Sequence, residues 1–255
     1  MGREVTVWPL ASGSNGNAIL LACNGSAVLI DDGISTKRLT KHLAEMGLTL
    51  DNLEAVLLTH EHSDHIGGLP VLRKRCKARL IASRGTARCL PFRGAETIVA
   101  GKSVDVGPFT IEAFKVPHDA EEPFGYVLDA GGFRITSATD VGHVTDCVLD
   151  AFAGADVAIV EANHDVEMLF NGPYPKFLKE RIRGPDGHLS NDEGAELAAH
   201  AATHGTKHLV LAHLSEQNNL PELAYAAAAI ALKRDGHKAK VQVAPRGRPG
   251  ERITL

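Results

Sequence analysis

Cysteine is scarce in this sequence. The 255-residue chain has four cysteines, Cys23, Cys76, Cys89 and Cys147, which lie far apart and include no CxxC pair. This spacing excludes the dense framework of a small disulfide-stabilised protein and is typical of reduced thiols in a reducing compartment. We therefore expect a cytoplasmic protein.

Long apolar segments and a strong charge of one sign are also absent. The N-terminal sequence MGREVTVWPLASGSNGN lacks the apolar core of a signal peptide, and no apolar run reaches the length of a membrane span. The formal net charge of -4 gives no reason to expect general attraction to nucleic acid. Basic residues do gather between residues 233 and 252, but charged tails often serve only solubility.

The remaining composition, with 44% hydrophobic and 23% charged residues, is that of an ordinary globular protein. Short apolar runs bounded by turn-forming residues predict strands over residues 5–8, 18–23, 27–30, 53–59, 79–82, 109–116, 124–129, 133–137, 156–160, 207–212 and 238–243. Helical patterns predict helices after Ser35, over residues 69–75, from Ser190 to about residue 204 and over residues 221–234, with a broken helical region after residue 160.

The order of these elements predicts a layered α/β fold. The first half is mainly strands, the second half alternates helices and strands, and no change in composition marks a linker. We therefore expect one domain over residues 1–255, with helices packed outside β-sheets. Residues 244–255 are predicted to form a loose basic tail.

The densest chemical feature is THEHSDHIGG, residues 59–68, directly after a buried apolar strand. His60 and His62 are two residues apart at the strand end, where both side chains point the same way. Asp64 and His65 follow at once. Imidazole and carboxylate groups suit zinc and related divalent ions, and four such groups in so short a loop indicate two neighbouring ions. A single histidine after a strand is usually structural, but this pattern as a unit predicts a metal site.

Further ligands must come from other strand ends, where His118, Asp140 and His213 are available. Two cations about 3.5–4 Å apart lower the pKa of a shared water enough to supply hydroxide near neutral pH. The pattern therefore predicts a hydrolase. It does not identify the substrate, because the same kind of site serves β-lactams, thioesters, phosphodiesters and redox chemistry.

Taken together, these motifs resemble the metallo-β-lactamase superfamily. The resemblance implies an αββα sandwich, with two facing mixed β-sheets flanked by helices and a dinuclear metal site at one sheet edge. It implies that one ion is held by His60, His62 and His118, and the second by Asp64, His65 and His213, with Asp140 bridging them.

The resemblance also covers two residues just after an early strand. It implies that Asp31 orients a ligand histidine without touching the metal. Asp32 stands where many members of the superfamily have a small residue, and the sequence suggests no function for it.

Several longer strings are similar to one bacterial branch of the superfamily, the WalJ or YycJ proteins. They are LASGSNGN, PHDAEEPFGY, EANHDVEMLFNGPYPKFLKERI, GHLSNDE and LAHLSEQNN, in this order. The resemblance implies a metal-dependent phosphodiesterase, a DNA exonuclease that acts from 5′ ends through a metal-bridged hydroxide. Its two divalent ions would be zinc or manganese, and the ligands also accept iron. The sequence does not indicate an oligomeric state.

Residues outside the ligand set are candidates for catalysis. The resemblance implies that His188 is the general acid that protonates the leaving oxygen, and the alternative is a surface loop histidine. Ser190 is the predicted N-cap of a helix whose N-terminus can bind phosphate. Glu161 and His164 follow a strand at the ligand edge. Glu161 either tunes the site or makes a structural hydrogen bond. His164 either holds substrate or makes a structural hydrogen bond.

Two polar segments are candidates for substrate contact. An early Gly-rich loop can offer hydroxyls and amides to phosphate, or can be only a tight turn; its candidates are Ser12, Ser14, Asn15 and Asn17. A later basic run either contacts a nucleic acid backbone or forms a solvated helix face; its members are Lys176, Lys179, Arg181 and Arg183.

Three other functions compete with the nuclease. The main alternative is a small-molecule hydrolase, either a thioesterase of the glyoxalase II kind or a lactamase. The lack of a signal peptide argues against a secreted lactamase. A metal-bearing DNA-binding scaffold without turnover would not need so complete a ligand set. A flavodiiron-type oxidoreductase would need a flavin-binding domain, which the sequence does not show.

Overall fold

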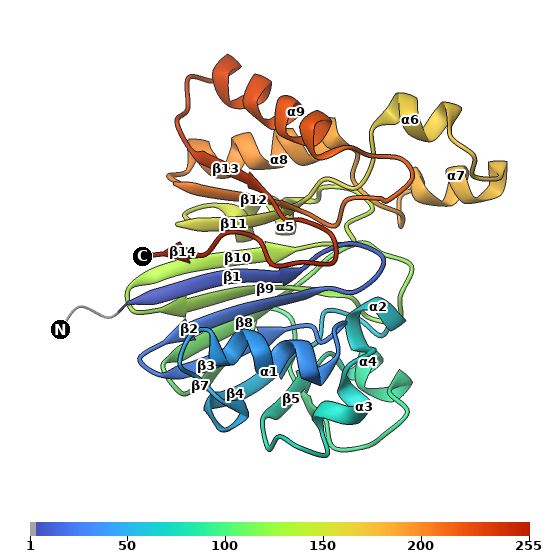
Figure 1. Ribbon diagram of the computed structural model, residues 1–255. Coiled ribbons are helices and arrows are strands. Elements are labelled where there is room, and N and C mark those ends of the chain that lie inside the picture. The colour runs from blue at the N-terminus through green and yellow to red at the C-terminus, as the bar shows by residue number, and fades with distance from the viewer. Residues whose placement is uncertain (1–3) are drawn as a thin grey trace.

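Two seven-stranded β-sheets face each other across the centre of the molecule (Figure 1). This computed structural model describes residues 4–255. The first sheet, in the order β14-β1-β2-β3-β4-β5-β6, is formed by β1 (Val5–Ala11), β2 (Ala18–Cys23), β3 (Ser26–Ile30), β4 (Leu53–Leu57), β5 (Arg79–Ala82), β6 (Glu96–Thr97) and β14 (Ile253–Thr254). The second, in the order β13-β12-β11-β10-β9-β8-β7, is formed by β7 (Ser103–Val106), β8 (Phe109–Lys115), β9 (Phe124–Ala130), β10 (Phe133–Ala138), β11 (Val157–Glu161), β12 (His208–Ala212) and β13 (Lys240–Val243).

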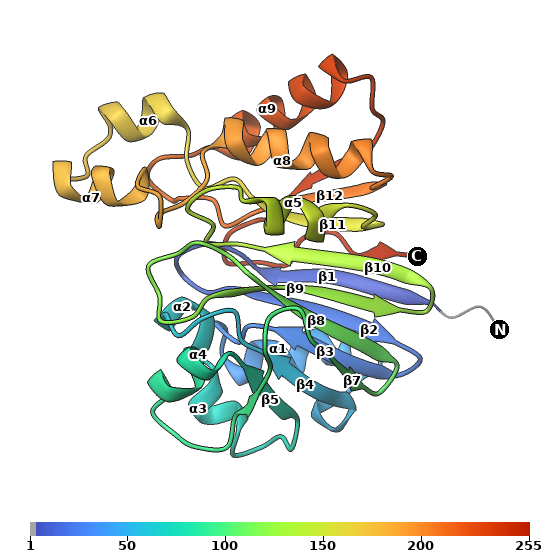
Figure 2. The same ribbon diagram turned by 180° about the vertical axis from the view of Figure 1, so that it is seen from behind.

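Helices flank the two sheets (Figure 2). Those beside the first sheet are α1 (Thr36–Ala44), α2 (Ser63–Ile66), α3 (Leu69–Leu72) and α4 (Arg84–Cys89), and those over the second are α5 (Asp146–Phe152), α8 (Asn191–Thr203) and α9 (Pro221–Arg234). Two short helices, α6 (Val166–Asn171) and α7 (Lys176–Ile182), project beyond one end of the second sheet, on the same side as α2. Within residues 4–255, none of the helices is long and apolar enough to cross a membrane.

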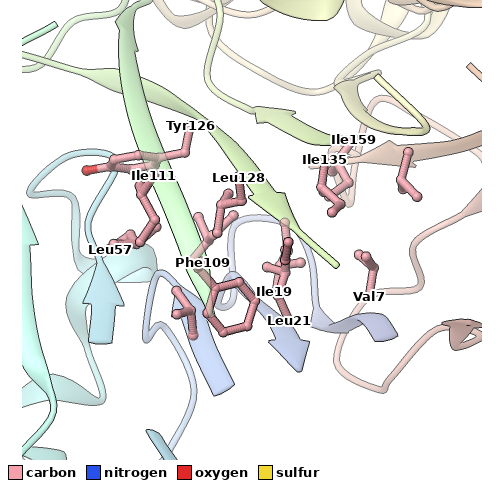
Figure 3. Packing of buried hydrophobic residues seen from close by; sticks show 14 of the residues in the cluster. Val7, Ile19, Leu21, Leu57, Phe109, Ile111, Tyr126, Leu128, Ile135 and Ile159 are labelled. Atoms are coloured by element: carbon pink, nitrogen blue, oxygen red, sulfur yellow. The ribbon is translucent and has the colours of Figure 1, made fainter. Parts of the chain in front are cut away.

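The main core lies between the sheets, where alternate side chains of facing strands meet (Figure 3). Val7 and Leu21 from the first sheet belong to one cluster with Ile111, Ile135 and Ile159 from the second. The intervening residues of β1 and β2 belong to a second cluster, which includes apolar side chains of α1 and α3. Because both faces of these strands are covered, every residue of β1 and β2 is buried, which is why they read as continuous apolar runs.

The predicted sandwich of two mixed sheets flanked by helices is confirmed. The predicted broken helical region corresponds to α6 and α7, and the helix capped by Ser190 has the full capping box with Glu193. The helices α2, α4 and α5 and the short strands β6 and β7 were not predicted. The expectation of a single domain over residues 1–255 stays a prediction.

Two residues near the end of the segment predicted as a loose tail, residues 244–255, form a strand. Ile253 and Thr254 form β14, which pairs antiparallel with Val7 and Thr6 of β1. The alternation of Ile253 with charged and polar neighbours was too short to be recognised as a strand. Ile253 is 6% exposed and belongs to the main core, so its burial holds this end of the chain against β1.

Candidate metal centre

The ends of five parallel strands bring predicted site residues to one edge of the molecule. β3 runs parallel to β4 in the first sheet, and β10, β11 and β12 are parallel in the second. The residues at or just after these strand ends are Asp31, His60, Asp140, Glu161 and His213. Because the carboxyl ends of parallel strands meet at one sheet edge, residues far apart in the sequence lie together there.

Three of these residues have a left-handed backbone conformation. The angle φ is 59° at Asp31, 61° at Asp140 and 59° at His213. Each such residue costs about 1 kcal/mol or more unless the surrounding structure requires it. Within residues 4–255, Asn24 in the turn after β2 is the one other non-glycine residue with positive φ. Backbone strain is therefore concentrated at this edge, as is common at functional sites.

The first group of side chains consists of His60, His62 and His118. The ring centroids of His60 and His62 are 4.5 Å apart, and that of His118 is 5.0 Å from His60 and 5.2 Å from His62. One nitrogen of each ring lies within 4.8 Å of one nitrogen of each other ring. Three imidazoles at this spacing can hold one divalent ion and leave a position open.

A second group consists of Asp64, His65 and His213, whose candidate ligand atoms also lie within 4.8 Å of one another. Asp64 and His65 lie in the single turn of α2, whose N-cap is His62. Asp64 Oδ2 is 3.4 Å from His65 Nε2 and 3.7 Å from His213 Nε2. One carboxylate and two imidazoles form a second set suited to a divalent ion.

Asp140 lies between the two groups. Its Oδ2 is 3.2 Å from His65 Nε2, and its Oδ1 is 3.7 Å from His118 Nε2. The side chain is almost fully buried. Its carboxylate is therefore placed to contact an ion in either group, as the resemblance implies for a bridging ligand.

Several buried atoms at the centre of the site have no hydrogen-bond partner. They are His60 Nε2, His118 Nε2, His213 Nε2 and Asp140 Oδ2. Buried polar atoms without partners are rare in folded proteins, and each costs about 1–3 kcal/mol. Four of them converging on one place fit a site for metal ions.

The opposite nitrogen of each of these three rings is held by the protein. Nδ1 of His60 lies 3.0 Å from the Thr59 hydroxyl, and Nδ1 of His118 lies 3.1 Å from the Gly187 carbonyl. Nδ1 of His213 lies 2.9 Å from Glu161 Oε1. Such contacts fix the ring and leave Nε2 free, which is the usual arrangement of metal-binding histidines. The residues present therefore suit divalent metal ions.

Asp31 lies behind His65. His65 Nδ1 is 2.7 Å from Asp31 Oδ2, and the carboxylate also accepts hydrogen bonds from the backbone and hydroxyl of Thr59. Asp31 is thus in contact with a histidine of the second group and with none of the unpartnered atoms. This is the position that the resemblance implies for it.

Glu161 joins the two halves of the site. Its Oε1 is 2.9 Å from Nδ1 of His188 and 2.9 Å from Nδ1 of His213. Its Oε2 accepts hydrogen bonds from the backbone of Val141 and Leu189. Although burial favours the neutral acid, the charge and hydrogen bonds of His188 and His213 lower the pKa of Glu161 to about 2. A buried carboxylate therefore orients a predicted metal ligand and the predicted general acid together.

The carboxylates of the site favour positive charge at its centre. Burial opposes the charged form of His213, but Asp140 together with Asp64 and Glu161 raises its pKa to about 10. Burial also opposes the ionised form of Asp140, yet His213 and His65 hold its pKa well below the usual range. A metal ion that binds His213 must displace a proton, so metal affinity is expected to fall as the pH falls.

Two of the residues predicted to bind substrate already have partners within the protein. Ser12 is buried, and its hydroxyl accepts a hydrogen bond from the backbone N–H of His213. The Ser190 hydroxyl donates to Glu193 and caps α8. Both therefore support the site, and a substrate contact for either stays a prediction.

The other predicted substrate contacts lie at different depths. Ser14 and Asn15 are exposed, and the Asn15 amide donates to Glu216 across the site loops. His164 is buried, its Nδ1 has no partner, and burial lowers its pKa to about 4. Its bridge to Ser190 ties the end of β11 to the start of α8, and its part in substrate binding stays a prediction.

Two contacts around the metal-binding segment were not predicted. Nδ2 of Asn17 is 3.0 Å from His65 Nε2 and 3.1 Å from Asp64 Oδ2. The carboxylate of Glu61 accepts hydrogen bonds from the backbone of Glu121 and the hydroxyl of Thr86. The string LASGSNGN contained the signal for Asn17, whereas no sequence pattern links Glu61 to these distant partners.

Replacement of Glu161 by glutamine is expected to weaken metal binding about 10- to 100-fold, the usual effect of losing a residue that orients a ligand. Glutamine has a single side-chain oxygen. If that oxygen contacts the two rings, the NH₂ group stands where the second carboxylate oxygen was and cannot accept the two backbone hydrogen bonds. A chelator-competition titration of zinc measures the change. Glu167→Gln on exposed α6 is the matched control, and equal affinity of both variants would contradict the role.

Three comparisons place the chain among known proteins. A family model described as "Beta-lactamase superfamily domain" matches residues 27–214. "Exodeoxyribonuclease WalJ" of Streptococcus pneumoniae serotype 2 (strain D39 / NCTC 7466) is 39% identical over 225 residues, 85% of this chain and 84% of that protein. "Exodeoxyribonuclease YycJ" of Bacillus anthracis is 35% identical over 243 residues, 92% of this chain and 91% of that protein.

Among solved structures, the metallo-β-lactamase fold protein YhfI from Bacillus subtilis is similar, with a TM-score of 0.75 and 17% sequence identity. The match covers 99% of this chain and 100% of that chain, and it shows the fold. The predicted resemblance is confirmed by the family model and by the two relatives, which match over most of their length. The chain belongs to the β-lactamase superfamily, in the branch that includes the WalJ and YycJ proteins.

Proposed function

We propose that this protein is a metal-dependent DNA exonuclease that holds two divalent ions. The observation that carries the proposal is the pair of ligand groups with Asp140 between them. His60, His62 and His118 form the first set, Asp64, His65 and His213 form the second, and zinc or manganese suits both. The printed names of the WalJ and YycJ relatives support DNA as the substrate.

Bound ions of this kind supply a nucleophilic hydroxide near neutral pH and neutralise charge on the phosphate under attack. The chain's own residues position that chemistry. Asp31 and Thr59 fix His65, and Glu161 fixes His213. Glu161 also holds Nδ1 of His188, so Nε2 of His188 is the atom that would carry a proton to the leaving oxygen.

The test is digestion of end-labelled oligonucleotides by purified protein loaded with Mn²⁺ or Zn²⁺. Stepwise loss of nucleotides from the 5′ end is the expected result, and loss from the 3′ end would contradict the proposed polarity. DNA and RNA left intact while a thioester is cleaved would overturn the nuclease proposal in favour of the glyoxalase II type of hydrolase.

Replacement of His188 by alanine is expected to lower the rate about 10²- to 10⁴-fold, the range for loss of a general acid, while both ions stay bound. Metal content and single-turnover rate are measured on the same sample. His188 also lies in a group with Asp140, Glu161 and His213 that could hold a metal. Loss of an ion in this variant would therefore assign His188 as a ligand instead.

We further propose the cytoplasm as its compartment. Within residues 4–255, no two cysteines form a disulfide, in keeping with the reducing environment expected from the sequence. Fractionation of the native host would test the location.

A further inference from the structure

A cavity of about 170 Å³ lies beside the metal centre. Its walls come from segments far apart in the sequence. Ser14 comes from the loop after β1, Asn163 follows β11, and Tyr174 lies between α6 and α7. Leu178 and Arg181 come from α7, one of the two helices that project at this edge.

The cavity reaches the predicted catalytic groups. His188 lines it, and the His188 ring centroid is 5.1 Å from that of His118 and 5.3 Å from that of His213. Asp119 also lines it, and its Oδ1 is 3.3 Å from His118 Nε2. A group bound in the cavity therefore lies next to the phosphate that the metal centre would attack.

The walls of the cavity combine several kinds of side chain. Tyr174 and Leu178 are aromatic and apolar, whereas Ser14 and Asn163 are polar. The Arg181 guanidinium donates through Nε to Asp119, which leaves its two terminal nitrogens as donors for an anion. An aromatic ring, an apolar side chain, polar groups and a neighbouring cation are together suited to the base of one nucleotide, with the attached phosphate near the cation.

The size of the cavity limits the form of that nucleotide. A volume of about 170 Å³ is below the usual 300–1,000 Å³ of pockets for drug-sized ligands, so the cavity suits a single base with its sugar and phosphate outside it, and not two stacked or paired bases. We propose that the cavity receives the end nucleotide of a single strand, with its base against the Tyr174 ring. The substrate class is then unpaired DNA ends. This inference rests on the proposed nuclease function and adds a residue that selects the form of the substrate.

Single-stranded oligonucleotides test the role of Tyr174. Replacement of Tyr174 by alanine is expected to slow cleavage about 5- to 150-fold, the range for loss of one base–aromatic stack. Tyr174→Phe keeps the ring and is expected to act like the wild type. Phe177→Ala is the matched control, because Phe177 lies on the same projecting segment, is 71% exposed and does not line the cavity.

An abasic end nucleotide distinguishes contact from a structural effect. At the degraded end it is expected to slow the wild type, with no further loss from Tyr174→Ala, because both changes remove the same stack. An abasic site at the third nucleotide is expected to leave the full effect of Tyr174→Ala. Equal losses on all three substrates, or blunt duplex cut as fast as single strands, would overturn the inference.

Binding without cleavage separates this inference from the proposed function. A short single strand with 2-aminopurine as its end base is titrated in EDTA, and its fluorescence is expected to be quenched by the wild type and not by Tyr174→Ala. Quenching of this kind without any DNA cleavage by the metal-loaded protein would leave the cavity assignment and remove the nuclease function. Cleavage of single strands that is unaffected by Tyr174→Ala would keep the nuclease function and rule out the cavity assignment.

Discussion

Replacement of Asp140 by asparagine is expected to lower DNA cleavage at least about 10³-fold, because metal ions contribute several kcal/mol to such a reaction. Asp140 is the carboxylate that lies against histidines of both ligand groups, so its charge serves both ions. Asparagine is chosen because it tolerates the left-handed backbone of φ 61° better than alanine does. The fold is then kept while the charge is lost.

Metal content and rate should be measured together for this variant. We expect fewer than two ions per chain in Asp140→Asn, and an unchanged metal content in the control Asp129→Asn, whose side chain is exposed and paired with Arg134. Asp64→Ala, which removes a ligand of the second group alone, should keep the first ion. Two ions retained in Asp140→Asn with a rate within tenfold of the wild type would contradict a bridging role.

Replacement of Asp32 by asparagine is expected to stabilise the protein by about 4 kcal/mol at pH 7. Asp32 is fully buried, neither carboxylate oxygen has a partner, and Gly68 packs closely against it. Burial, with a smaller contribution from Asp31, raises its pKa from 3.8 to about 7. The folded state therefore binds this proton more tightly than the unfolded state, and stability is lost as the pH rises between these two values.

The pH dependence identifies the cause of this gain. In urea unfolding with EDTA, the free energy of unfolding of Asp32→Asn is expected to exceed that of the wild type. The same two pKa values give a difference of about 2 kcal/mol at pH 5 and about 4 kcal/mol at pH 7. Asp31→Asn is the neighbouring control, and it should destabilise the protein because Asp31 binds His65 and Thr59. An advantage of Asp32→Asn that does not change with pH would show that the buried charge is not responsible.

The sequence predicted the parts of this molecule that depend on local pattern. Fully covered strands such as β2 read as apolar runs, and the helix α8 has its cap and capping partner three residues apart. The metal-binding segment has its spacing set by one strand end and one helical turn. Those signals all lie within a few residues of each other.

The features that were missed depend on contacts between distant segments. β14 is too short to recognise alone, and it becomes a strand because β1 offers a free edge. The two imidazoles on one oxygen of Glu161 come from residues 27 and 52 positions away. The cavity beside His188 needs the loop after β1 and the helix α7 together. Resemblance supplied the ligand roles, but it could not supply these contacts.

Each ligand group draws on both sheets. His60 and His62 follow a strand of the first sheet, whereas His118 follows a strand of the second, and the same division separates Asp64 and His65 from His213. A chain in which one sheet alone has formed holds neither complete set. We therefore expect the proposed metal binding, and the activity that depends on it, to require both sheets.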